Sequence, residues 1–399
     1  MSETPWLSII GLGEDGPDGL SPASRNALDN AEIVMGPPRH LKLLAACKAQ
    51  LIEWPVPFAD GIERLLPLRG QKVAMLVSGD PFWFGAGATV TQHLDQSEWV
   101  SFPSISTFSL VASRLGWSLQ STLCAGLHAT PFESLRADLS DGLKAILLMR
   151  DGAAVGEFAG YLCQTGFEDS QLHILEALNG PRERIRSVRA NGAIPTDIQH
   201  PVCIGVEIKC GGASLPLSTG RSDSWFDNDG QITKRPVRAL TLSALAPTAG
   251  EHLWDIGGGS GSISVEWCLS HPTNCATVIE TRQDRSERIE QNARKFGLDR
   301  LKVVQTRAPE GLTELDPPNA VFIGGGLSDD LLTSLVTLLP RGTRIVANSV
   351  TLESDALLTQ WHKRLGGDLM RIELSSLSAI GPRRGWKAAY PHVQWSVTL

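Results

Sequence analysis

A glycine-rich turn is the stretch of the chain whose residue types and spacing most clearly suggest chemistry. Its sequence is "DIGGGSGSIS" (255–264), and it directly follows the apolar run "HLW". Glycine lets the backbone turn tightly after a strand and opens the N-terminus of the next helix toward a ligand. A dinucleotide site would use the spacing G-x-G-x-x-G to seat a pyrophosphate, but Gly257, Gly259 and Gly261 follow G-x-G-x-G. Asp255, so close to the turn, would repel a pyrophosphate and suits the ammonium group of an amino acid.

S-adenosylmethionine carries such an ammonium group and no phosphate, so it is the cofactor that this turn predicts. We expect the whole turn to contact it: Gly257, Gly258, Gly259, Ser260 and Gly261. Glu280, at the end of "TVIE", falls where an acid can accept both ribose hydroxyls, a feature shared with NAD sites. Ala308 is small enough to lie against the adenine. The plain alternative is a glycine-rich strand-to-helix turn with a surface glutamate and no ligand.

These candidate residues follow apolar runs that predict five parallel strands with helical stretches between them. The runs are "LWDIG", "ATVIET", "LKVVQT", "NAVFIGG" and "TRIVANSV". Near the end, "DLMRIELSS" and "VQWSVTL" predict a closing antiparallel pair. The pattern is that of a doubly wound, Rossmann-like sheet with a terminal hairpin.

The first half of the chain shows the same alternation, which predicts a second parallel α/β fold. Its apolar runs are 7–13, 72–80, 144–150, 171–178 and 202–209. A glycine loop with G-x-G-x-x-G spacing stands at 11–16, but acidic residues around it make a poor phosphate cradle. Residues 211–231 are rich in Gly, Ser and Asp without an apolar period, so we expect a linker between domains 1–210 and 232–399.

The composition of the chain excludes several classes of protein. The net charge of −7, with neither half strongly basic, argues against a nucleic-acid partner. No apolar run of about 18 residues is present, so we expect no membrane span. The N-terminus lacks the basic start of a signal peptide. Seven scattered cysteines without a CxxC pair favour neither zinc nor disulfides, and they fit a reducing cytoplasm.

The segment leading into the glycine turn carries a family resemblance. "ITKRPVRALTLSAL" (232–245), with Thr233 lying 24 residues before Gly257, resembles the opening of the decarboxylating C15-methyltransferases of corrin biosynthesis. The resemblance covers roughly 232–399. It implies a class I methyltransferase fold in which Thr233 contacts the cofactor. The ends of strands four and five, "FIGGG" (322–326) and "ANSV" (347–350), fall where ligands bind in open α/β sheets.

The N-terminal half resembles another family, the tetrapyrrole methylases. The resemblance rests on "LVSGDPFWFGAG" (76–87) and "FPSISTFSLVASRLG" (102–116). It implies two α/β subdomains with an S-adenosylmethionine site between them, and the implied contacts are Gly13, Gly79, Asp80, Ser106 and Thr107. The sequence departs from the family at "LHAT" (127–130), where His-Gly-Arg is common. An arginine that would hold a substrate carboxylate is therefore missing.

The two resemblances meet in the fused C5,15-methyltransferases of corrin biosynthesis. They imply a precorrin tetrapyrrole substrate, methyl transfer to C5 by the first half, and methyl transfer to C15 with loss of CO₂ from the ring C acetate by the second. They also imply two S-adenosylmethionine sites, one per domain. A homo-oligomer without nucleic-acid or membrane partners is expected. The substrate carries many carboxylates, so we expect arginines to bind it, namely Arg235, Arg383 and Arg384, with Lys234 and Arg238 as further candidates.

No nucleophile, triad or metal-ligand cluster stands out, so the sequence predicts no metal and identifies no catalytic residue. Methyl transfer needs none, because the sulfonium is already a strong electrophile and alignment can supply most of the catalysis. Two alternatives stay open. One is a methyltransferase of RNA or of another small molecule, and the other is a fusion whose N-terminal site has degenerated.

Overall fold

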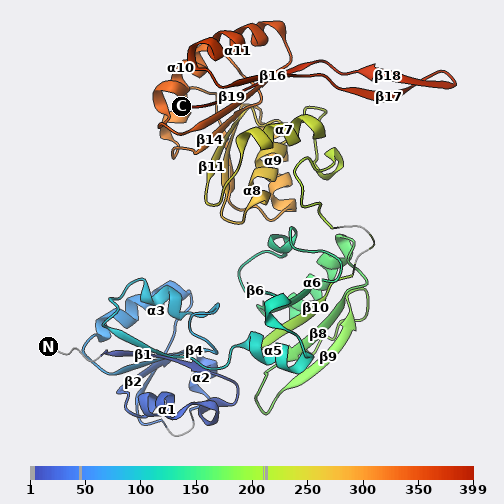
Figure 1. Ribbon diagram of the computed structural model, residues 1–399. Coiled ribbons are helices and arrows are strands. Elements are labelled where there is room, and N and C mark those ends of the chain that lie inside the picture. Colours follow the sequence, from blue (N-terminus) through green and yellow to red (C-terminus); the bar gives the residue numbers. More distant parts are fainter. Residues whose placement is uncertain (1–4, 45–46, 210, 212–213) are drawn as a thin grey trace. The chain divides into compact units, whose positions relative to one another are not determined.

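The computed structural model describes residues 5–44, 47–209, 211 and 214–399 (Figure 1). Residues 210, 212 and 213, at the expected domain boundary, lie outside the described residues. The chain divides into two compact units, one of Met1–Phe132 with Leu139–Ser214 and one of Glu133–Asp138 with Leu215–Leu399. No helix in the described part of the chain is both long and apolar enough to cross a membrane.

The first unit begins with a parallel five-stranded sheet in the order β3-β2-β4-β1-β5. Its strands are β1 (Leu7–Leu12), β2 (Ile33–Gly36), β3 (Gln50–Glu53), β4 (Val73–Ser78) and β5 (Trp99–Phe102). Its helices are α1 (Pro22–Asp29), α2 (Pro38–Leu41), α3 (Phe58–Leu65) and α4 (Gly87–Thr91). The central strands are buried on both faces, as parallel strands covered by helices must be.

The second sheet of this unit has the order β6-β7-β10-β8-β9. Its strands are β6 (Leu123–Leu127), β7 (Lys144–Met149), β8 (Gln171–Glu176), β9 (Arg184–Arg189) and β10 (Val202–Glu207), and α5 (Thr107–Leu115) and α6 (Gly152–Gln164) accompany them. Only β6 and β7 pair in parallel, while β10 runs antiparallel to both β7 and β8. The expectation of a parallel sheet is wrong here, because a fully buried apolar run looks the same in either direction.

The second unit contains the doubly wound sheet, in the order β13-β12-β11-β14-β15-β19-β16. Its parallel strands are β11 (His252–Ile256), β12 (Cys275–Glu280), β13 (Leu301–Gln305), β14 (Ala320–Ile323) and β15 (Arg344–Ser349). The helices are α7 (Arg235–Leu245), α8 (Ser262–Ser270), α9 (Gln283–Lys295), α10 (Asp329–Leu338) and α11 (Leu352–Leu365). The order reverses between β11 and β14, and ligands of such sheets bind at that point.

The closing antiparallel pair is confirmed, since β16 (Asp368–Ile372) pairs with β19 (His392–Thr398), which in turn pairs with β15. Between them the chain forms a separate hairpin of β17 (Ser375–Ile380) and β18 (Arg383–Ala388). This hairpin projects away from the sheet (Figure 1).

Residues 215–231, which we expected to be linker, belong to the compact C-terminal unit. A buried ion pair fixes them there. Glu266 on α8 accepts hydrogen bonds from the backbone N–H groups of Gly220 and Arg221, at 2.7 and 3.0 Å. It also pairs with Arg238 of α7, with 2.7 Å between Nε and Oε1. Because an unpaired charge in the core would be costly, this network holds the segment firmly against α7 and α8.

Candidate active site

The glycine turn forms the floor of a pocket because it passes very close to neighbouring backbone. Gly257 has φ +75°, and a Cβ there would lie 2.7 Å from the Cα of Gly325, at the end of β14. Gly261 has φ +71°, and a Cβ there would lie 2.8 Å from the side chain of Ile289. Only glycine satisfies both the conformation and the spacing. The turn and the loop after β14 therefore meet at the carboxyl ends of their strands.

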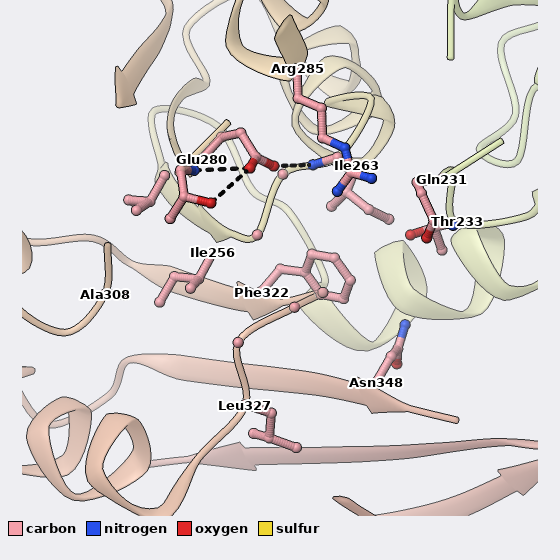
Figure 2. A pocket seen from close by; sticks show the side chains of 18 of the residues that line it. Gln231, Thr233, Ile256, Ile263, Glu280, Arg285, Ala308, Phe322, Leu327 and Asn348 are labelled. Carbon is pink, nitrogen blue, oxygen red and sulfur yellow. Dashed lines mark hydrogen bonds between the residues drawn. The ribbon is translucent and has the colours of Figure 1, made fainter. Parts of the chain in front are cut away.

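A cavity of about 1070 Å³ opens above this turn. Most residues that the sequence predicts to hold the cofactor line it, namely Thr233, Gly257, Gly258, Gly259, Ser260, Glu280 and Ala308. Gly261 is the N-cap of α8, directly beyond the lining residues. Thr233 and Ala308 lie on opposite sides of the pocket in Figure 2. The predicted cofactor residues thus come from four separate segments of the chain and meet at one site.

Glu280 is held rigidly at the end of β12 (Figure 2). One carboxylate oxygen accepts a hydrogen bond from the N–H of Gly259 at 3.1 Å. The other accepts from the N–H groups of Thr281 and Arg282 at 2.9 and 3.0 Å. The side chain is 4% exposed. A carboxylate fixed in this way has acceptor capacity left for the hydroxyls of a ribose.

Asp255 does not face the pocket as we expected. Its side chain is buried under α8, where Oδ2 accepts a hydrogen bond from Ser264 Oγ at 2.7 Å. Burial raises the pKa of this carboxyl to about 6, and the nearby charge of Glu280 acts in the same direction. Successive side chains of a strand point to opposite faces, and it is Ile256 that lines the pocket. The spacing of the residues did not reveal toward which face of the sheet the Asp255 side chain points.

The far end of the pocket, at β15 and β19, contains one residue from a motif noted in the sequence, Asn348, and others that the sequence did not single out. Asn348 lines it, and its Nδ2 donates to Thr241 Oγ1 at 2.8 Å. Gln394 of β19 donates to the same hydroxyl and to Asn348 Oδ1, at 3.1 and 3.0 Å. His392, the first residue of β19, also lines the pocket. The motif "ANSV" located Asn348, but nothing near His392 marked it as part of a site.

The basic residues expected to hold substrate have different surroundings. Arg238 is fully buried and paired with Glu266, so this candidate is wrong as a substrate contact. Arg235 begins α7 and is not among the residues that line the pocket. Arg383 and Arg384 are exposed on β18, in the projecting hairpin, and they do not line it either. The guanidinium groups that do line it belong to Arg285 and Arg307.

A second, smaller cavity of about 170 Å³ lies between the two sheets of the N-terminal unit. All five residues implied by the tetrapyrrole methylase resemblance line it: Gly13, Gly79, Asp80, Ser106 and Thr107. Gly79 has φ +56°, and a Cβ there would lie 3.1 Å from the carbonyl oxygen of Ile105. Asp80 Oδ1 accepts from the N–H of Phe82 at 2.8 Å, and Ser106 caps α5.

Charged and titratable groups gather at this second cavity. Arg39 lines it and forms an ion pair with Glu14, which also pairs with Arg182 at 3.0 Å. Arg39 thus supplies a cation although "LHAT" lacks one. His128 and His200 line the same cavity, and desolvation lowers the pKa of each imidazole. For His200, the charge of Arg39 adds to the lowering.

Neither cavity is built around a metal site. Among the residues that the structure describes, no group of three His, Cys, Asp or Glu side chains is placed to hold a metal ion. The polar groups at both cavities include backbone N–H groups, hydroxyls, imidazoles, carboxylates and guanidiniums. They suit an organic ligand with hydroxyl, ammonium and carboxylate groups.

Two family models match the chain, one for each unit. The Tetrapyrrole (Corrin/Porphyrin) Methylases match residues 7–191, and the Precorrin methyltransferase domain matches residues 224–399. The second range includes the glycine turn and the whole sheet around the larger cavity.

Similar proteins extend along the full chain. The Precorrin-6Y C(5,15)-methyltransferase [decarboxylating] of Sinorhizobium sp is 44% identical over 99% of this chain and 97% of its own length. The protein of the same name from Mycobacterium tuberculosis (strain CDC 1551 / Oshkosh) is 36% identical over 98% of this chain and 99% of its own length. The Cobalt-precorrin-6B C(15)-methyltransferase (decarboxylating) of Salmonella typhimurium is 30% identical, and the match spans 40% of this chain and 85% of that protein.

Proposed function

The chain belongs to the precorrin-6Y C5,15-methyltransferase family, and from this premise we propose how its two units divide the reaction. It is an S-adenosylmethionine-dependent, decarboxylating methyltransferase of cobalamin biosynthesis. We propose that the N-terminal unit methylates C5 and that the C-terminal unit methylates C15 and removes CO₂ from the ring C acetate. A shorter relative named for the C15 reaction alone matches 40% of the chain, a share close to that of one unit, and this supports the division.

The proposal includes two S-adenosylmethionine sites, one in each cavity. When bound, this cofactor supplies a methyl group activated on a sulfonium. The larger cavity suits it because Glu280 offers a fixed carboxylate to the ribose and Gly257 lets the backbone come close. At the smaller cavity, Gly79, Asp80, Ser106 and Thr107 surround the space in the way that the tetrapyrrole methylase resemblance implies.

The size of the larger cavity supports binding of both cofactor and substrate in the C-terminal unit. At about 1070 Å³, it exceeds what a typical drug-sized ligand occupies. We propose that the cofactor occupies the end near Glu280 and Ala308, and that the macrocycle enters near Asn348 and His392. The residues of this unit then align the meso carbon and exclude water, which is where positioning contributes most.

The carboxylates of the precorrin require cations outside the cofactor site. We propose Arg383 and Arg384, with Arg235, as residues that bind them. Carboxylates at the rim of a macrocycle extend away from its reacting carbon, so a projecting hairpin can meet them. Arg285 and Arg307 line the cavity itself and can contribute closer to the reaction.

We also propose that the protein works as a homo-oligomer in the cytoplasm. The β17–β18 hairpin exposes four apolar side chains, which a second copy of the chain would cover: Leu377, Ile380, Trp386 and, just beyond it, Tyr390. Exposed apolar patches of this kind are typical of interaction sites. Light scattering of the wild-type chain beside Trp386→Ser tests this; a monomeric wild type would contradict it.

The observation that carries the proposed function is the pair of cavities, each lined by the residues of one methyltransferase motif. To test the proposed function, the full-length chain is incubated with a purified precorrin substrate and S-adenosylmethionine, and the product is analysed by mass spectrometry. We expect two added methyl groups and the loss of one CO₂. A product with one methyl group would leave one of the two units without its proposed role.

A further inference from the structure

The chemistry proposed for the C-terminal unit requires that one proton be removed and that another be added. A meso carbon that carries a hydrogen forms a C–C bond to the methyl group with its π electrons, while the C–S bond breaks and its electron pair stays on sulfur. The meso C–H proton must then leave so that conjugation is restored. This step releases one proton for each methyl group transferred.

Loss of CO₂ from the ring C acetate has the opposite requirement. The C–C bond to the carboxylate breaks, its electron pair flows into the macrocycle, and a proton is added where the carboxylate stood. One proton is therefore consumed for each CO₂ released. Because methylation at C15 releases one proton and decarboxylation takes up one, a single group on the cavity wall can carry both transfers without net change.

His392 has the geometry for that task. It is the first residue of β19, and it lines the larger cavity with Asn348 and Val350 at the end of β15. Its Nδ1 lies 3.1 Å from the carbonyl oxygen of Tyr390. A carbonyl only accepts hydrogen bonds, so Nδ1 carries the hydrogen and Nε2 is left to exchange a proton.

The other titratable groups on the cavity wall suit the task less well. Arg285 and Arg307 carry guanidinium groups, which do not release protons in proteins. Glu280 is held by three backbone N–H groups, and we have proposed that its remaining acceptor capacity binds the ribose of the cofactor. Glu310 and Asp330 also line the cavity, but Glu310 follows β13 near Ala308 and Asp330 belongs to α10, whereas we propose that the macrocycle enters at β15 and β19. An imidazole is the side chain that readily accepts and donates a proton near neutrality.

We propose that His392 is a catalytic residue of the C-terminal unit, which accepts the proton released by methylation at C15 and donates a proton during decarboxylation. The inference rests on the proposed function, because it requires both reactions to occur at the larger cavity. His392 would serve both proton transfers whether methylation or decarboxylation comes first.

The test uses the full-length chain with His392→Gln, which keeps a polar side chain of similar length. We expect C15 methylation and CO₂ release to fall together by about 100-fold, the lower range for loss of a general acid or base. C5 methylation, at the other cavity, should keep its wild-type rate. Calorimetry should show unchanged affinity for S-adenosylhomocysteine. His362→Gln, on α11 outside the cavity, is the matched control.

A second variant separates proton transfer from structure. In His392→Ala, added imidazole should restore part of both C-terminal reactions, which a purely structural role would not allow. Wild-type rates in His392→Gln, loss of only one of the two reactions, or loss of S-adenosylhomocysteine binding would each overturn the inference. A wild-type chain that releases no CO₂ would refute the proposed function instead.

Discussion

The two cavities of this protein are built in different ways. The larger one lies above a single sheet, where strand ends and one glycine turn bring its lining together. The smaller one lies between two sheets and collects residues from both, such as Gly79 of the first and Pro201 beside the second. A site built on one turn depends on local geometry, whereas a site between two sheets depends on how they pack. The two should therefore respond differently to substitution.

The sharpest way to separate the two cavities is Gly257→Ala. The new Cβ would lie 2.7 Å from the backbone of Gly325, and φ is +75°, so the turn must move. We expect C15 methylation and decarboxylation to fall by at least about 100-fold, the cost of a displacement near 1 Å, with C5 methylation unchanged. Product analysis measures both. Gly342→Ala, at φ +91° with open space around it, controls for backbone strain. Equal loss of C5 methylation would show that the cavities are not independent.

The converse variant is Gly79→Ala at the smaller cavity. A Cβ there would lie 3.1 Å from the Ile105 carbonyl, a milder conflict, with φ +56°. We expect C5 methylation to fall by about 30-fold while CO₂ release keeps its wild-type rate. The control is Gly116→Ala, which has φ +67° and no neighbour within 4 Å. If C5 methylation survives intact, the smaller cavity is not the C5 site.

The projecting hairpin tests how far substrate binding extends beyond the larger cavity. A charge-assisted pair ordinarily contributes about 1.5–3 kcal/mol, but exposure and salt weaken it on a surface. We therefore expect the double change Arg383→Ala and Arg384→Ala to raise the precorrin KM for decarboxylation by about 10-fold. Affinity for S-adenosylmethionine should not change, because its proposed contacts lie elsewhere. An unchanged KM would show that these arginines do not bind substrate.

The smallest effect on activity is expected at Asp255, whose role is in stability. Burial raises its pKa to about 6 from the ordinary 3.8, so the folded protein holds this proton more tightly than the unfolded chain does. The contribution of Asp255 to the free energy of unfolding is therefore most favourable below pH 3.8, and it is lost as the pH rises through 6. Over that window, the free energy of unfolding of wild type should fall by about 3 kcal/mol relative to Asp255→Asn.

Urea unfolding of the C-terminal unit at a series of pH values measures this difference. Asp299→Asn, at an exposed position, serves as the control. Parallel pH curves for wild type and Asp255→Asn would mean that the carboxyl is not held in a desolvated site.

The difference between the cavities also explains what the sequence could predict. The glycine turn and Glu280 belong to one strand–turn–helix–strand unit, so their spacing located them. Gly13, Asp80 and Ser106 followed from the family resemblance, since no local rule joins three separate loops. Arg238 was misjudged because a basic residue on a helix shows nothing of a buried Glu266 on the next one. His392 was missed because it is a single residue at a strand start.

The division of the reaction between the two units requires two cofactor sites in one chain. Titration calorimetry of the full-length protein with S-adenosylhomocysteine measures their number. We predict two molecules bound per chain in the wild type, and one in either Gly257→Ala or Gly79→Ala. A wild-type stoichiometry of one would contradict the account, because a single cofactor site could not serve two separate cavities.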